Sequence, residues 1–189
     1  MLIFYDVDTQ NDFMNEDGAL YVPGAEEIKG YLKLLTAHAI DNNIQIVGSI
    51  DSHNDAKEFK DQNSELIING GIFPDHCMIG THGQQKIPET HTVYGEYFCK
   101  SSINAFNDDG YCLRKYLSDK LVTEAVVYGV ATDFCVKAAV LGMQKMGIQC
   151  SVVLDAVRGV FPDKVLLAIQ EMQQVGAKFI SLEDALRRS

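Results

Sequence analysis

Short apolar runs alternate with segments of helical apolar spacing along this chain, and this alternation restricts the fold more than any other feature. The apolar runs cover residues 2–7, 44–50, 125–130, 150–154 and 177–181. Helical spacing follows three of them, over residues 28–39, 136–143 and 163–175, and a short charged helix is expected after the last. Because strands that alternate with helices form parallel sheets, the pattern predicts a three-layer, Rossmann-like α/β fold with a mostly parallel sheet flanked by helices.

A long irregular stretch interrupts the alternation at about residues 52–99. It is rich in glycine, proline and histidine and includes Gly70-Gly71 and Phe73-Pro74. Such insertions more often form a site than a linker. Because 189 residues suit one domain and no shift in composition marks a boundary, we expect a single domain over residues 1–189, with this insertion beside its site.

Charge and cysteine content limit the partners and the compartment. The formal net charge is −10, and no basic run is longer than Arg187-Arg188, so we expect no nucleic-acid or membrane partner. Five cysteines without C-x-x-C spacing favour a reducing compartment. The N-terminus lacks signal-peptide features, and no apolar run reaches the length of a membrane span. We therefore expect a cytoplasmic protein that acts on a small molecule, with the question of a homo-oligomer left open.

Reactive side chains follow several of the predicted strands. Asp8 follows the first strand, and Asp51 and His53 follow the second. Lys100 ends a further strand, and Cys135 follows a later one. Ligands of open parallel sheets bind beyond the carboxyl ends of the strands, so these side chains are expected to share one site.

Cys135 is a candidate nucleophile because it lies near the start of a helix, where backbone N–H groups and the helix dipole lower the pKa of a thiol. Asp8 is a candidate to take the thiol proton and return it to a leaving amine. Lys100 is a candidate to stabilise both negative charges. Taken singly, each is more often structural: a buried thiol, a turn-capping carboxylate and a solvated lysine. Their shared placement favours catalysis.

A weaker pattern concerns metal ligands. Asp51 and His53 lie two residues apart, so an extended segment would direct both side chains to the same side. His76 is a candidate third ligand, in competition with His82 and His91. Two imidazoles and a carboxylate suit zinc, iron or manganese, although this pattern also occurs by chance.

Several segments, taken in order, resemble the isochorismatase-like cysteine hydrolases, and among them the nicotinamidases most closely. The resemblance covers nearly the whole chain. The matching segments are 8–13 (Asp-Thr-Gln-Asn-Asp-Phe), 51–53 (Asp-Ser-His), 73–77 (Phe-Pro-Asp-His-Cys) with Gly80-Thr81, Lys100, and 129–136 (Gly-Val-Ala-Thr-Asp-Phe-Cys-Val). The last segment is the most specific.

This resemblance implies a catalytic triad of Cys135, Asp8 and Lys100, which forms a thioester with the acyl group of an amide and releases ammonia. It also implies a cis peptide bond between Val130 and Ala131. The backbone N–H groups of Ala131 and Cys135 would then form the oxyanion hole.

The resemblance also implies one divalent metal ion, with zinc as the first choice and iron or manganese as alternatives. In nicotinamidases the metal holds the ring nitrogen of the substrate, and here the ligands would be Asp51, His53 and His76. Phe13 and Phe73 match the ring-stacking positions, although phenylalanines of this kind are more often core residues.

The chain departs from the family pattern at three places, of which one is Phe73, where a tryptophan is common before Pro-x-His-Cys. Lys57, Phe59 and Lys60 stand where the family often has another imidazole, so a site with three protein ligands is expected. After Lys100 the chain lacks a tyrosine- and glycine-rich run, and we assign the pocket wall there to Phe106.

Three other functions compete with nicotinamide hydrolysis. A phosphoacceptor receiver domain also places acidic residues and a lysine after its strands, which Asp6, Asp8, Asp51 and Lys100 would imitate. A second rival is an amidase of the same superfamily that acts on a carbamoyl or ureido compound without a metal. A third is a scaffold that keeps the fold without catalysis, against which the retention of all three catalytic residue types argues.

Overall fold

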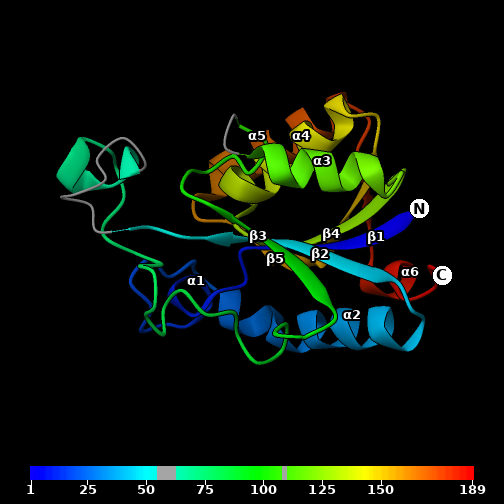
Figure 1. Cartoon of the computed structure of the whole chain (residues 1–189), viewed down its shortest axis with the longest axis horizontal. Helices are drawn as coiled ribbons and strands as arrows, with labels where there is room; N and C mark the ends of the chain where they lie inside the picture. The colour runs from blue at the N-terminus through cyan, green and yellow to red at the C-terminus, as the bar shows by residue number, and fades with distance from the viewer. Residues whose placement is uncertain (55–62, 108–109) are drawn as a thin grey trace.

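A parallel β-sheet forms the centre of the molecule (Figure 1). The computed structural model describes residues 1–54, 63–107 and 110–189. Within these ranges the strands are β1 (Leu2–Val7), β2 (Gln45–Asp51), β3 (Gly95–Lys100), β4 (Glu124–Val130), β5 (Gln149–Arg158) and β6 (Lys178–Ile180). They lie in the order β3-β2-β1-β4-β5-β6, and all neighbouring pairs are parallel. This confirms the predicted Rossmann-like α/β fold.

Helices cover both faces of the sheet (Figure 1). One face carries α3 (Tyr111–Asp119), α4 (Lys137–Lys145) and α5 (Pro162–Gln174), and the other carries α1 (Asn11–Met14), α2 (Lys29–Asp41) and α6 (Leu182–Ala185). The apolar stripe of α2 explains its placement, because Leu32, Leu35 and Ala39 are fully buried against the sheet. Two hydrophobic cores result, one on each side.

Two elements differ from the sequence-based expectation. Helix α3 was not predicted, because it is short and buries only Leu113 and Leu117 among polar neighbours. Strand β5 continues past Leu154 to Arg158, where it pairs with the end of β4. The longer strand brings the loop after β5 to the same edge of the sheet as the ends of β1 and β4.

The strand order reverses between β1 and β4, and this switch point is where doubly wound sheets bind ligands. Gly129 of β4 makes the close approach of the two strands feasible. Its φ angle is +112°, and an added Cβ would collide with the carbonyl oxygen of Val7. Asp8 and the segment after Val130 therefore leave the sheet side by side.

The segment between β2 and β3 is the predicted insertion, and its described part extends beyond the carboxyl edge of the sheet (Figure 1). An isolated bridge joins His53 to Met78, and another joins Gln10 to Lys86. These bridges hold the insertion against the ends of β1 and β2. Lys57, Phe59 and Lys60, where the family often has an imidazole, lie outside the described residues.

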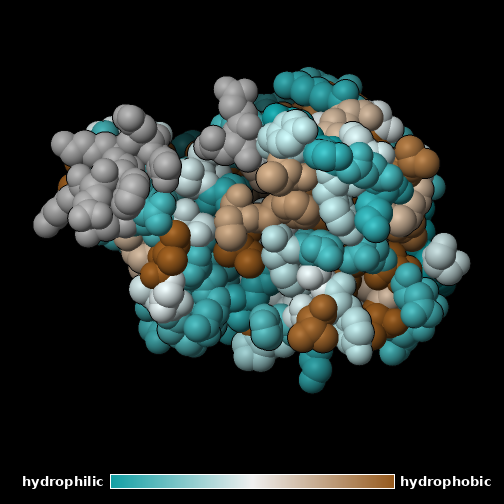
Figure 2. Space-filling model, in the orientation of Figure 1, coloured by the Kyte–Doolittle hydropathy of each residue, from teal (hydrophilic) through white to brown (hydrophobic). Residues whose placement is uncertain are grey.

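The outer surface is mostly polar on the face drawn in Figure 2, with hydrophobic residues in small separate groups. Among the helices that the structure describes, none is long and apolar enough to cross a membrane. All five cysteines fall within the described ranges, and all five are free thiols.

Candidate active site

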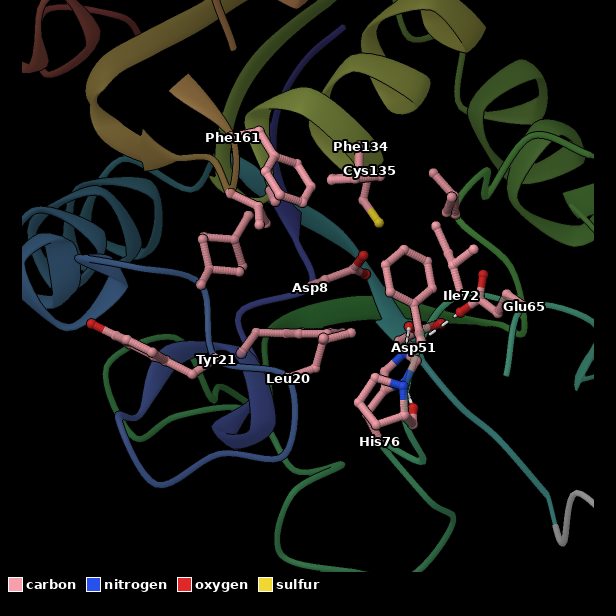
Figure 3. Close-up of a pocket in the computed structure, with 18 of the residues that line it drawn as sticks. Asp8, Leu20, Tyr21, Asp51, Glu65, Ile72, His76, Phe134, Cys135 and Phe161 are labelled. Carbon is pink, nitrogen blue, oxygen red and sulfur yellow. Dashed lines mark hydrogen bonds and ion pairs between the residues drawn. The ribbon is translucent and has the colours of Figure 1, made fainter. Parts of the chain in front are cut away.

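A cavity of about 350 Å³ opens at the carboxyl edge of the sheet, around the switch point (Figure 3). Asp8, Ala131 and Cys135 line it at the ends of β1 and β4. Asp51 and His76 line it from the end of β2 and from the insertion. Two further charged residues, Glu65 and Lys164, line it as well, and the rest of the lining is mainly apolar: Phe13, Leu20, Tyr21, Val22, Ile72, Phe73, Pro74, Ile103, Val130, Phe134, Val160 and Phe161. The cavity therefore suits a small, largely apolar ligand with a few polar contacts.

The three side chains proposed as a catalytic triad converge at this cavity. The ammonium nitrogen of Lys100 lies 3.0 Å from Oδ2 of Asp8 and 3.6 Å from Sγ of Cys135. Asp8 and Lys100 are almost fully buried, whereas Cys135 is partly accessible. The nucleophile Cys135 therefore reaches the cavity, while the carboxylate of Asp8 and the ammonium group of Lys100 lie buried beside it.

Cys135 lies on a π-helical turn, Thr132–Val136, that precedes α4. Burial raises the pKa of its thiol well above the ordinary value; Lys100 lowers the pKa, and the carboxylate of Asp8 raises it. The helix start was expected to lower the thiol pKa, whereas burial raises it in the free protein. Burial dominates because the thiolate would lose its hydration. The thiol holds its proton beside Asp8 until a base removes it.

Asp8 is held in position from two sides. Its φ angle is +47°, so the chain turns directly after β1 and the carboxylate leaves the plane of the sheet. The Ser49 hydroxyl donates to Oδ1 of Asp8 over 2.7 Å, while Lys100 contacts Oδ2. Although burial lowers the pKa of Lys100, the carboxylates of Asp51 and Asp8 outweigh it and raise that pKa well above the ordinary value. Lys100 therefore stays charged.

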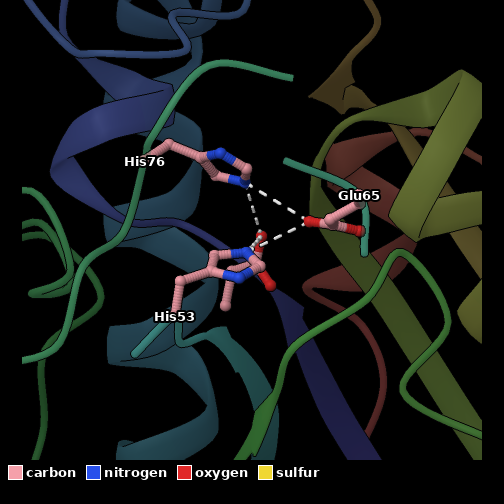
Figure 4. Close-up of side chains that lie close together, drawn as sticks. His53, Glu65 and His76 are labelled. Atoms are coloured by element: carbon pink, nitrogen blue, oxygen red, sulfur yellow. Dashed lines mark hydrogen bonds and ion pairs between the residues drawn. The ribbon is translucent and has the colours of Figure 1, made fainter. Parts of the chain in front are cut away.

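A second cluster lies at the other end of the cavity and consists of Asp51, His53, Glu65 and His76 (Figure 4). One potential ligand atom from each residue lies within 4.8 Å of all the others. Nε2 of His53 is 3.1 Å from Oε1 of Glu65, and Nε2 of His76 is 3.1 Å from Oδ2 of Asp51. His82 and His91 are exposed and do not belong to the cluster.

Both imidazoles are oriented by acceptors behind them. Nδ1 of His53 lies 3.0 Å from Oδ1 of Asn63, and Nδ1 of His76 lies 2.7 Å from the carbonyl oxygen of Pro74. A proton on each Nδ1 leaves the Nε2 lone pair facing the centre of the cluster, which is the arrangement that metal-binding histidines use. Two nitrogen and two carboxylate ligands suit zinc, iron or manganese, so the residues fit a divalent metal.

The charges of the cluster are strongly coupled in the metal-free protein. Burial lowers the pKa of His53, but hydrogen bonds to Asp51 and Glu65 outweigh it and raise that pKa to about 10. The same balance raises the pKa of His76 to about 9. Burial opposes ionisation of Asp51, yet Lys100 and the two histidines hold its pKa well below the ordinary range. A metal cation would replace the two imidazole protons.

Glu65 is a further candidate ligand that sequence analysis did not identify. The sequence predicted Asp51, His53 and His76 alone, and the structure brings a second carboxylate from the insertion to the cluster as a fourth candidate ligand. Glu65 is one of 26 acidic residues, and no local spacing distinguishes it from the others. Only the path of the insertion brings it to the cluster.

The predicted aromatic residues occupy two different places. Phe13 and Phe73 line the cavity and flank His76, with ring centroids 5.5 and 5.9 Å from the imidazole. Phe106 does not line this cavity; it lies in a neighbouring hollow against Gly142. The segment after Lys100 turns so that Ile103, not Phe106, reaches the cavity.

Sequence analysis did not identify Phe134 and Phe161 as cavity residues (Figure 3), although the Phe134 ring packs edge-on against Phe73, with ring centroids 5.7 Å apart. The ring centroids of Phe134 and Phe161 are 6.2 Å apart. Phe134 directly precedes Cys135, so its place in the sequence next to the candidate nucleophile could have identified it as a cavity residue. Phe161 comes from the loop after β5, and nothing in its local sequence points to the cavity.

The doubly wound sheet, with a thiol, a carboxylate and an ammonium group in contact at its carboxyl edge, is the arrangement of an α/β-class enzyme with a cysteine nucleophile. The sequence matches the isochorismatase domain over residues 1–184, so the chain belongs to the isochorismatase family of hydrolases. The peptide bond between Val130 and Ala131 is cis, as the resemblance implied.

Known proteins similar to this chain agree with that assignment. The chain is 31% identical to the nicotinamidase of Escherichia coli, with 94% of this chain and 93% of that protein covered. It is 26% identical to the nicotinamidase/pyrazinamidase of Mycobacterium tuberculosis, over 92% and 95% of the two chains. The zinc complex of the Pyrococcus horikoshii pyrazinamidase superposes with a TM-score of 0.84 at 27% identity, covering 95% of this chain and 98% of that one.

Proposed function

We propose that this protein hydrolyses nicotinamide, or a closely related small aromatic amide, to the acid and ammonia through a thioester on Cys135. One observation carries the proposal. A single, mainly apolar cavity has Cys135 and Asp8 at one end and the Asp51 cluster at the other, and the buried Lys100 contacts both groups. A flat ring with an amide at one side and a basic nitrogen at the other matches that distribution of groups.

In the first half of the reaction, Asp8 takes the proton from the Cys135 thiol and the sulfur attacks the amide carbon. The carbonyl oxygen becomes an oxyanion, for which the backbone N–H groups of Ala131 and Cys135 are the proposed donors. Asp8 then gives its proton to the nitrogen, the C–N bond breaks, and ammonia leaves. The acyl group remains on sulfur as a thioester.

In the second half, Asp8 takes a proton from a water molecule, whose oxygen attacks the thioester carbon. The C–S bond breaks, the sulfur regains a proton, and the acid leaves. Throughout the cycle the Lys100 ammonium stabilises the charges of the carboxylate and the thiolate, since it contacts both side chains.

The metal is proposed to position the substrate. Asp51, His53, Glu65 and His76 would hold a divalent ion, which would offer a coordination position to the ring nitrogen. Phe13 and Phe73 flank His76, where they would pack on the ring. Zinc is the first candidate, because the similar Pyrococcus horikoshii pyrazinamidase was crystallised with zinc.

The receiver-domain alternative does not agree with the fold. Receiver domains have the strand order 2-1-3-4-5, whereas this sheet has the order β3-β2-β1-β4-β5-β6.

The test is ammonia release from nicotinamide, pyrazinamide and carbamoylated amines, with metal content measured on the same preparations. We expect turnover of the two aromatic amides. Cys135→Ala should lower kcat at least about 10³-fold, while Cys99→Ala, at an exposed thiol outside the cavity, should leave it unchanged. Turnover of a carbamoyl compound alone by the metal-loaded protein would support the carbamoyl or ureido alternative instead.

A further inference from the structure

Asp133 is a buried carboxylate next to the nucleophile, and the proposed reaction gives it no role. It is 6% exposed and lies two residues before Cys135, on the π-helical turn Thr132–Val136. The sequence places it within the most family-specific segment, but none of the chemical steps uses it. A charged group that is buried beside an active site must be satisfied by specific partners.

The partners of Asp133 are two consecutive backbone N–H groups of the loop after β5. Val160 donates to Oδ1 over 2.9 Å, and Phe161 donates to Oδ2 over 3.0 Å. Both carboxylate oxygens of Asp133 therefore accept hydrogen bonds from the same loop. Hydrogen bonds to a charged acceptor are about twice as strong as neutral ones, so this pair fixes the loop against the Cys135 turn.

The residues held in this way form part of the cavity wall. Val160 and Phe161 both line the cavity, and the Phe161 ring is paired with that of Phe134. Phe161 is 47% exposed, so packing alone restrains its ring weakly. Lys164, which also lines the cavity, lies over the same ring, 4.3 Å from its centroid. The position of Phe161 thus depends on its backbone, and that backbone is bonded to Asp133.

Gly159 shows how closely the loop approaches the turn. A Cβ added at this position would lie 2.8 Å from Oδ1 of Asp133 and 3.3 Å from Cβ of Thr132, and it would collide with the side chain of Val165. Only glycine allows the loop to reach the carboxylate without a shift of its neighbours.

We propose that Phe161 is a specificity-determining residue for the ring of the substrate, and that Asp133 is the positioning residue that holds it there. The carboxylate acts on substrate selection through the wall and leaves the reactivity of the thiol unchanged. The identity of the substrate rests on the function proposed above, but the coupling between Asp133 and Phe161 does not.

The experiment measures alkylation of Cys135 by two reagents, iodoacetamide and its N-phenyl derivative, followed by mass spectrometry of the Cys135 peptide. The rate constant for the N-phenyl derivative divided by that for iodoacetamide is the measured ratio. It reports how favourably the cavity wall contacts a ring. Asp133→Asn keeps the shape of the side chain but cannot accept two N–H groups in the same way. We expect this variant, like Phe161→Ala, to lower the ratio about fivefold, in line with the energy of one aromatic contact.

The double variant decides whether the two residues act together. If Asp133 acts through Phe161, adding Asp133→Asn to Phe161→Ala should not lower the ratio further. An additive decrease would overturn the proposal, as would an Asp133→Asn variant that slows both reagents equally. Asp155→Asn is the matched control, because Asp155 also accepts a backbone N–H, from Leu182, but lies outside the cavity. Its ratio should equal that of the unchanged protein.

A further variant covers the case in which Asp133→Asn does not fold. Gly159→Ala disturbs the same contact from the side of the loop. A lowered ratio in this variant would support the proposal, and an unchanged ratio would refute it. None of these measurements requires hydrolysis. The alkylation ratios would therefore still test the coupling between Asp133 and Phe161 if nicotinamide were not a substrate.

Discussion

Lys100 and Asp51 form an ion pair with 3.0 Å between Nζ and Oδ1, and the same ammonium group lies 3.0 Å from Asp8. The register of the sheet produces this contact, because Asp51 and Lys100 are partners at the ends of β2 and β3. One buried cation therefore joins the proposed acid–base residue to the proposed metal cluster. The two ends of the cavity are electrostatically coupled through it.

This coupling makes Lys100 important for stability as well as for turnover. Lys100→Met would leave the buried carboxylate of Asp8 without a cation and would remove one of the cations that pair with Asp51, and we expect it to lower the free energy of unfolding by about 3–5 kcal/mol. Chemical denaturation measures this change. Lys115→Met is the control, since it removes a solvent-exposed pair with Asp119 and should cost less than about 1 kcal/mol. Equal losses in the two variants would contradict the buried pairing.

The state of the Cys135 thiol predicts a pH profile for alkylation. Because its pKa is raised well above the ordinary value, the thiol is protonated at neutral pH. The rate of its reaction with iodoacetamide should rise about tenfold per pH unit, without a plateau below pH 9. Mass spectrometry of the Cys135 peptide separates this signal from the exposed Cys99 and Cys112. A plateau near pH 6 or 7 would show that a thiolate is already present in the free protein.

Glu65, the fourth candidate ligand, predicts a change in metal affinity. Glu65→Gln removes one carboxylate from the cluster, so the protein should bind zinc at least about tenfold more weakly. Competition with a chromophoric chelator measures this affinity without any need for turnover. Glu96→Gln, at an exposed position on β3, should bind zinc as the unchanged protein does. If the two variants bind equally, Glu65 is not a ligand.

The raised histidine pKa values predict opposite pH trends for stability and for metal uptake. In the metal-free protein the pKa values of His53 and His76 are about 10 and about 9, above the unfolded value of about 6.5. Their contribution to stability is complete below pH 6.5 and is lost as the pH rises through 9 to 10. Metal binding displaces these protons, so zinc affinity should increase over the same range.

Thermal unfolding of chelator-treated protein at pH 6.5 and pH 9.5 tests the first trend, and chelator competition at the same pH values tests the second. The carboxylates of Asp51 and Glu65 have lowered pKa values, so their contribution is present above the unfolded value and is lost only in acid. They do not oppose the trend between pH 6.5 and 9.5. Metal-free protein that gains stability over this interval would contradict the assigned histidine charges.

Much of the fold follows from local pattern. Strand β1 ends where its apolar run ends, and the sheet is parallel because helices separate its strands. Helix α3 escaped prediction because it buries only Leu113 and Leu117. The single-domain organisation and the cytoplasmic location stay predictions.

The sequence by itself determined the residues at the ends of β1, β2, β3 and β4, because strand ends in a parallel sheet meet at one edge. Asp8, Asp51, Lys100 and Cys135 were found in this way. Only the tertiary structure decided that Glu65 joins the metal cluster, that Phe161 forms the wall, and that Phe106 lies outside the cavity. These three lie on loops, whose paths depend on long-range contacts such as those of Asp133, and no local spacing encodes such contacts.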